Sequence, residues 1–120
     1  MKHHRQSEPI LIPQIDVMEA ARRQGEAAIL LDVRTPEEYH AGHAPSAIWI
    51  PLDEIANRIG ELDRNKAILA ICRAGSRSQS AAEFLALQGY STSNVTGGMS
   101  AWAAAGLDIT TDGTGSGEII

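Results

Sequence analysis

The sequence predicts an α/β fold with a mostly parallel central sheet of four to five strands and helices on both of its faces. Three short apolar runs, at residues 28–33, 47–50 and 67–71, carry this prediction because they are nearly continuous rather than alternating. Continuous apolar runs are typical of parallel strands that are buried on both faces. Segments with helical periodicity lie between the runs, and strands that alternate with helices favour a parallel sheet.

Two weaker strands and the two chain ends complete the predicted organisation. Residues 93–95 are a fourth strand candidate, and residues 10–12 are a candidate edge strand. We expect one domain over residues 10–109, since a chain of 120 residues suffices for one hydrophobic core. Residues 1–9 are expected to form a flexible N-terminal segment. Residues 110–120 are expected to form a flexible tail, because they hold too few apolar side chains to offset the entropy of ordering.

Capping residues mark the ends of the predicted helices. Thr35-Pro36-Glu37-Glu38 is a capping box with proline at the first helical position. Asp16 and Asp53 are N-cap candidates of two other helices, and glycines supply the expected stops. The predicted helical segments are residues 16–24, 35–42, 53–62, 78–88 and 99–105.

Composition and charge exclude several classes of function. Acidic side chains outnumber basic ones by 15 to 10, and the net charge of −5 disfavours binding to the phosphate backbone of nucleic acids. No apolar segment reaches membrane-spanning length, so no membrane partner is expected. His3 and His4 have no further Cys or His cluster beside them, so neither a metal nor another cofactor is expected.

Cys72 is the strongest functional candidate and the only cysteine of the chain. It stands where the apolar run 67–71 enters a small, doubly basic loop, Arg73-Ala74-Gly75-Ser76-Arg77-Ser78. A cysteine that only fills core space gains nothing from such neighbours. Loop N–H groups, the start of the following helix and two arginines lower a thiol pKa below about 8.5 and hold an anionic ligand. We therefore expect a thiolate nucleophile in a reducing, cytoplasmic setting.

Several separate stretches of the chain resemble the rhodanese family of sulfurtransferases in its single-domain form. The stretches that carry the resemblance are Leu31-Asp32-Val33-Arg34, Glu38-Tyr39, Gly42-His43, Ala44-Pro45-Ser46-Ala47, Ile50-Pro51, the active-site loop 72–78 and the closing motif Gly97-Gly98-Met99-Ser100-Ala101-Trp102. The likeness covers residues 12–109 and implies a rhodanese-like fold.

The resemblance also implies sulfur transfer through a persulfide on Cys72. The thiolate is expected to take the outer sulfur of a donor such as thiosulfate and to pass it to cyanide, a small thiol or a protein acceptor. Loop N–H groups from Arg73 to Ser78 are expected to stabilise the persulfide anion. Arg77 is expected to add a charge-assisted hydrogen bond to the persulfide, and Arg73 to attract the sulfonate part of the donor. Gly75 permits the tight turn.

Asp32 and Arg34 leave two roles open. On the first interpretation, an Asp-x-Arg sequence after a strand forms an ion pair that fixes the first loop at the carboxyl edge of the sheet, and for Arg34 we favour this role over a catalytic one. On the second, Asp32 holds an arginine of the active-site loop and so supports the site without touching the substrate.

Two other functions remain alternatives to a free sulfurtransferase. A persulfide carrier or partner-binding module retains the same intact Cys72, so the sequence does not separate it from an enzyme. A cysteine phosphatase or arsenate reductase is disfavoured by spacing. The active-site motif of those enzymes has the form Cys-x5-Arg, whereas only four residues lie between Cys72 and Arg77.

Overall fold

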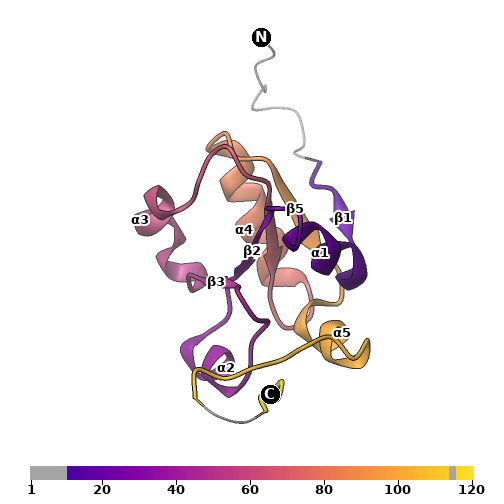
Figure 1. Cartoon of the computed structure of the whole chain (residues 1–120). Coiled ribbons are helices and arrows are strands. Elements are labelled where there is room, and N and C mark those ends of the chain that lie inside the picture. The colour runs from indigo at the N-terminus through magenta and orange to yellow at the C-terminus, as the bar shows by residue number, and fades with distance from the viewer. Residues whose placement is uncertain (1–10, 114–115) are drawn as a thin grey trace.

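The computed structural model describes residues 11–113 and 116–120, which form a five-stranded sheet with helices on both faces (Figure 1). Every pair of neighbouring strands is parallel, in the order β1-β5-β4-β2-β3. The strands are β1 (Gln14–Ile15), β2 (Ile29–Asp32), β3 (Ile48–Trp49), β4 (Ile68–Ile71) and β5 (Thr92–Val95). The predicted fold class is confirmed, and β4, which leads into Cys72, is the central strand.

Different helices cover the two faces of the sheet. α1 (Val17–Gln24) and α5 (Gly98–Ala104) lie on one face, and α3 (Ile55–Arg58) and α4 (Ser76–Leu87) lie on the other. Side chains of a strand alternate between faces, so Ile29 and Leu31 of β2 join one hydrophobic cluster and Leu30 joins the other. All four residues of β2 and of β4 are buried, as their apolar runs predict.

Helix caps place the elements that surround the site. Asp16 accepts a hydrogen bond from the Glu19 N–H group and caps α1. Thr35 and Glu38 form the predicted capping box at the start of α2 (Pro36–Ala41). The helix expected over residues 78–88 begins earlier, at Ser76, because Gly75 takes a left-handed φ of 118° and turns the chain directly into α4. The last loop residues therefore belong to the first turn of a helix.

Two predicted elements differ from the structure. The edge strand lies at Gln14–Ile15 rather than at residues 10–12, because the Pro13 carbonyl accepts from the Asn94 N–H group and starts the pairing there. The helix expected over residues 53–62 is instead three short pieces, η1 (Leu52–Glu54), α3 and η2 (Ile59–Glu61). Asp53 does not cap them, since it lies inside η1 and the N-cap position is Pro51.

The segment that follows α5 crosses to α2 along the carboxyl edge of the sheet (Figure 1). Thr110 and His43 exchange two backbone hydrogen bonds of 2.8 and 2.9 Å, and the Glu118 N–H group donates to the Ala41 carbonyl at 2.9 Å. These contacts fix where the segment lies. The expected flexibility of residues 110–120 stays a prediction, and residues 1–9 lie outside the described part of the chain.

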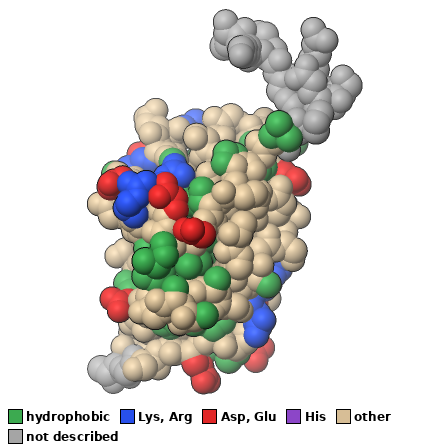
Figure 2. Space-filling view, turned by 90° about the vertical axis from the view of Figure 1, so that its right-hand side faces the viewer, with side chains coloured by type: hydrophobic (Ala, Val, Ile, Leu, Met, Phe, Trp, Pro, Cys, Tyr) green, Lys and Arg blue, Asp and Glu red, His purple; other side chains and the backbone are tan. Residues whose placement is uncertain are grey.

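On the face drawn in Figure 2, acidic and basic side chains are interspersed, and hydrophobic side chains lie among them. This mixture contrasts with the wide basic stripe of a nucleic-acid-binding surface. None of the helices within residues 11–113 and 116–120 is long and apolar enough to cross a membrane.

Candidate active site

Cys72 follows directly after β4 at the carboxyl edge of the sheet. In parallel α/β sheets this edge is where ligands bind. The Gly75 N–H group donates to Cys72 Sγ at 3.1 Å, and the Ser78 hydroxyl lies 3.2 Å from the same sulfur. The loop therefore wraps around the thiol and leaves the residue only 1% exposed.

The surroundings of Cys72 favour its charged form. Burial raises the pKa of the thiol, but hydrogen bonds from the side chain and backbone of Ser78 and from the N–H groups of Gly75 and Ala74 lower it by more. The net pKa of Cys72 thus lies below its ordinary value. The start of α4 adds its positive end to these donors. The expectation that Cys72 is an activated thiol stays a prediction, which this geometry supports.

The N-terminus of α5 holds the backbone of the cysteine loop. The Met99 N–H group donates to the Cys72 carbonyl at 2.7 Å, and the Ser100 N–H group donates to the Arg73 carbonyl at 3.0 Å. Gly98, with φ of 57°, packs directly against these two carbonyl groups and leaves no room for a Cβ atom. The glycine pair of the closing motif therefore fixes the height of the loop above the sheet.

Arg77 is bound to Glu38 of α2 rather than left free. The guanidinium donates to both carboxylate oxygens, at 2.7 and 2.9 Å. Hydrogen bonds from Arg77, with smaller contributions from the backbone and side chain of Thr35, outweigh burial and lower the pKa of Glu38 from 4.5 to about 2. Its remaining surface lines an open hollow of about 420 Å³ between the start of α2 and η1. Glu38 was predicted only as a capping residue, and its pairing with the active-site helix is a feature that the sequence did not reveal.

Asp32 and Arg34 form an ion pair in which both side chains are fully buried. Arg34 Nη2 donates to Asp32 Oδ2 at 2.7 Å and to the Gly42 carbonyl at 2.8 Å. The guanidinium thus ties the end of β2 to the end of α2. This is the geometry of the first interpretation, a pair that fixes the loop after β2, while Arg77 finds its carboxylate in Glu38.

The chain is similar to known proteins in sequence and in fold. The sequence model of the family described as Rhodanese-like domain matches residues 16–105. The chain belongs to the rhodanese family. A "Sulfurtransferase" of Allochromatium vinosum is 35% identical over 102 residues, which cover 82% of this chain and 95% of that protein. A "Thiosulfate sulfurtransferase GlpE" of Pseudomonas syringae is 39% identical over 70% of this chain and 78% of its own length.

A solved structure shows the same fold for this rhodanese-like chain. The crystal structure of a rhodanese-related protein from Thermoplasma volcanium superposes with a TM-score of 0.78 at 31% identity. The superposition covers 83% of this chain and 99% of that one. The rhodanese-like fold expected from the sequence motifs is therefore confirmed.

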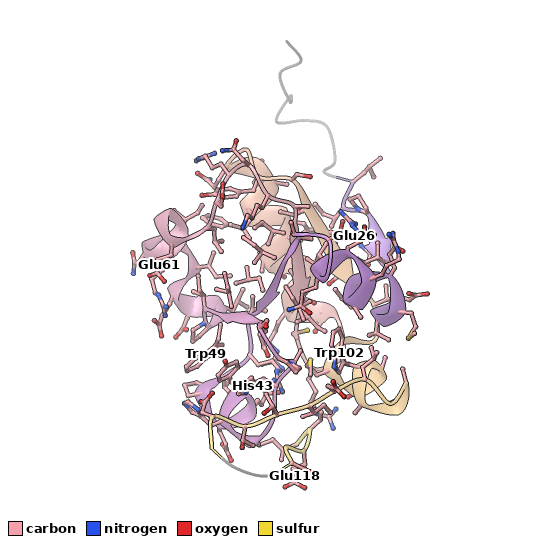
Figure 3. All side chains as sticks on the ribbon, viewed as in Figure 1. Glu26, His43, Trp49, Glu61, Trp102 and Glu118 are labelled. Carbon is pink, nitrogen blue, oxygen red and sulfur yellow. The ribbon has the colours of Figure 1, made fainter. Side chains whose placement is uncertain are left out.

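Arg73 lies on the exposed side of the rhodanese loop. Its Nε group donates to the Ile120 carbonyl at 2.7 Å, so residues 116–120 reach the rim of the site. On the other side of the same edge, Tyr39 stacks between His43 and Trp49, with ring centroids 3.9 and 4.5 Å apart. Figure 3 shows His43 and Trp49 together beside α2, with Trp102 across the edge near α5.

One polar residue beneath the loop, Asn94, was not predicted as part of the site. Asn94 of β5 accepts a hydrogen bond from the Ser78 hydroxyl at 2.6 Å, and both residues are buried. The sequence feature that could have pointed to Asn94 is an asparagine in a buried strand near the carboxyl edge of the sheet. Within residues 11–113 and 116–120, no three His, Cys, Asp or Glu side chains are grouped so as to hold a metal. His3 and His4 lie outside those residues.

Proposed function

We propose that this chain is a sulfurtransferase that moves a sulfane sulfur from a small anionic donor, such as thiosulfate, to cyanide or a thiol through a persulfide on Cys72. One observation carries the proposal: Cys72 Sγ accepts the Gly75 N–H group at 3.1 Å at the start of α4. Such a cradle stabilises an anionic sulfur, whether thiolate or persulfide. The name of the Pseudomonas relative supports thiosulfate as the donor.

The transfer consists of two half-reactions. In the first, the Cys72 thiolate attacks the outer sulfur of thiosulfate, a new S–S bond forms, and the donor's S–S bond breaks with its electron pair leaving on sulfite. In the second, the acceptor attacks the outer sulfur of the persulfide, and Cys72 leaves as a thiolate. Cys72 reacts as a thiolate already formed by the loop, and the acceptor reacts as the cyanide anion or as a thiolate that has lost its proton to solvent, so a base beside the Cys72 sulfur is not needed.

The charges around the loop suggest how the donor is held. Glu38 offsets most of the charge of Arg77, whereas Arg73 is exposed and donates to the backbone oxygen of Ile120. Arg73 is therefore proposed to attract the sulfonate part of the donor. Arg77 is proposed to orient the persulfide from the side of the hollow that it lines. A thiolate enzyme of this kind works in a reducing compartment, which supports the cytoplasm as its location.

Steady-state kinetics with thiosulfate and cyanide test the proposal. A covalent intermediate gives parallel double-reciprocal lines, and Cys72→Ser abolishes thiocyanate formation while leaving the unfolding midpoint near that of the wild type. Intersecting lines, or turnover by Cys72→Ser, contradict the proposal. Loading of Cys72 without release to cyanide or small thiols identifies instead a carrier that serves a protein acceptor.

A further inference from the structure

The hydroxyl of Ser78 lies between two groups that compete for its single proton. Cys72 Sγ is 3.2 Å away on one side, and Asn94 Oδ1 is 2.6 Å away on the other. Ser78 is fully buried and Asn94 is 4% exposed, so water does not readily replace either partner. A hydroxyl donates one hydrogen bond at a time, although it accepts more than one.

The orientation of the Asn94 amide decides which partner receives the proton. Asn94 Nδ2 lies 3.2 Å from the Gly75 carbonyl, which only accepts, and 2.8 Å from Gln14 Oε1. The amide nitrogen must therefore face Gly75, and the amide oxygen must face Ser78. An amide oxygen only accepts, so the Ser78 hydroxyl donates to Asn94 and offers a lone pair to Cys72.

Here the charge on the sulfur becomes important. A neutral thiol donates its S–H group to Ser78, and the chain Cys72 to Ser78 to Asn94 is then fully satisfied. A thiolate already accepts the Gly75 N–H group, and it gains the Ser78 hydroxyl as a further donor only if that proton turns from Asn94 to the sulfur. The turn leaves a buried amide oxygen without a partner. In the persulfide the charge resides on the outer sulfur, and the proton returns to Asn94.

We propose that Asn94 is a positioning residue that draws the Ser78 proton away from Cys72 and so sets how readily the Cys72 sulfur carries charge. The inference rests on the proposed sulfur transfer for its catalytic meaning. By competing for the proton, Asn94 favours the loaded persulfide over the free thiolate, and it makes the thiolate a poorer leaving group but a stronger nucleophile.

The charged side chains near Cys72 come from three parts of the chain, and none of them comes from β5. They are Arg73 and Arg77 of its own loop and helix, the Asp32–Arg34 pair after β2, and Glu38 of α2. β5 and α5, which also pack against the loop, consist of uncharged residues. Replacing Asn94 by an uncharged residue alters none of these charges, so a change in the titration of Cys72 reports the hydroxyl proton.

A double-mutant cycle tests the proposal through the pH dependence of Cys72 alkylation. With Asn94→Ala, the midpoint falls by about half a unit to one unit, because the thiolate gains the Ser78 donor without competition. With Ser78→Ala, the midpoint rises because that donor is lost. In the Ser78→Ala background, Asn94→Ala adds no further shift if Asn94 acts through the hydroxyl, whereas an effect through its contact with the Gly75 carbonyl persists in that background. Ser78→Thr, which keeps the hydroxyl, restores the response to Asn94→Ala.

Matched variants separate this role from a structural one. Thr92→Val removes a buried hydroxyl from the same strand, one that donates to the Ala82 carbonyl, and it leaves the midpoint unchanged. If Asn94→Ala fails to fold, Asn94→Ser replaces it, because a serine oxygen is one bond too short to reach Ser78 and predicts the same fall. An equal shift in both backgrounds, or a midpoint that stays or rises with the Asn94 variant, overturns the proposal.

The alkylation experiment does not depend on sulfur transfer, so the two proposals fail separately. If the double-mutant cycle shows the expected shifts of the alkylation midpoint but the protein never forms a persulfide, the hydroxyl network is supported and the proposed function is rejected. If both proposals are correct, persulfide-loaded Asn94→Ala releases its sulfur to cyanide up to about threefold faster than the loaded wild type in a single turnover. The reason is that a thiolate of lower pKa leaves faster.

Discussion

Replacing Glu38 by glutamine isolates the ion pair that joins α2 to the active-site helix. Glutamine also serves at the third position of a capping box, so the cap at Thr35 survives the change. Glutamine also keeps one acceptor oxygen, so lost stability reports the negative charge and the second acceptor oxygen that Glu38 offers to Arg77, which donates at 2.7 and 2.9 Å. Glu37→Gln, an exposed change in the same first turn, is the matched control and is expected to alter stability by less than about 0.5 kcal/mol.

The size of the effect follows from the pKa of Glu38. A fall from 4.5 to about 2 corresponds to at most about 3 kcal/mol. The Arg77 side chain is 34% exposed and that of Glu38 15%, so solvent screening reduces this figure. We expect Glu38→Gln to lower the free energy of unfolding at pH 7 by about 1 to 2 kcal/mol.

The pH dependence of the stability difference between the wild type and Glu38→Gln tests whether the ion pair is its cause. Because the pKa of Glu38 is depressed in the folded state, the pair contributes fully above pH 4.5 and loses its contribution as pH falls towards about 2. Urea denaturation from pH 7 down to the acid limit of folding measures this, since urea adds no salt that would screen the pair. The difference between wild type and Glu38→Gln should shrink below pH 4.5. A difference that is absent at pH 7, or constant with pH, shows that the Glu38–Arg77 pair does not make this contribution to stability.

Three further expectations concern the loop and its support. Asp32→Asn leaves the buried Arg34 without a counter-charge and should lower the free energy of unfolding by about 3 to 5 kcal/mol in urea titrations, so a midpoint like that of the wild type would contradict the buried pair. Gly98→Ala pushes a Cβ atom to 2.6 Å from the Arg73 carbonyl carbon and should lower sulfur transfer by about a hundredfold. Gly106→Ala, at another left-handed position with nothing within 4 Å, is its control, and equal losses in both would reject the contact. The alkylation rate of wild-type Cys72 should reach half its plateau below pH of about 8.5, and a midpoint at or above that value would show that the loop does not activate the thiol.

The features that could be predicted from the sequence are local. Apolar runs located β2 and β4 because a strand buried on both faces has few polar positions. The capping box at Thr35 was read correctly because its hydrogen bonds join residues three apart. Residue types alone singled out Cys72 and its loop as the candidate site, since an anionic sulfur needs small and basic neighbours, and that role stays a prediction.

The features that could not be predicted depend on how distant elements pack. Glu38 and Arg77 lie 39 residues apart, and only the placement of α2 beside α4 brings them together. The Ser78–Asn94 contact similarly requires the pairing of β4 with β5. The edge strand was misplaced because a two-residue strand carries almost no periodic signal. The helix predicted over residues 53–62 is instead three short helical pieces, although Ile55 and Leu62 are buried.

The intact mass of the protein after incubation with thiosulfate tests most directly whether Cys72 carries a persulfide. We expect the wild type to gain the mass of one sulfur atom per chain and to lose it again when cyanide is added. Peptide mapping should place the added sulfur on Cys72, and Cys72→Ser should show no gain under the same conditions. A wild-type protein whose mass does not change, or sulfur that also adds to Cys72→Ser, would contradict persulfide chemistry at this site.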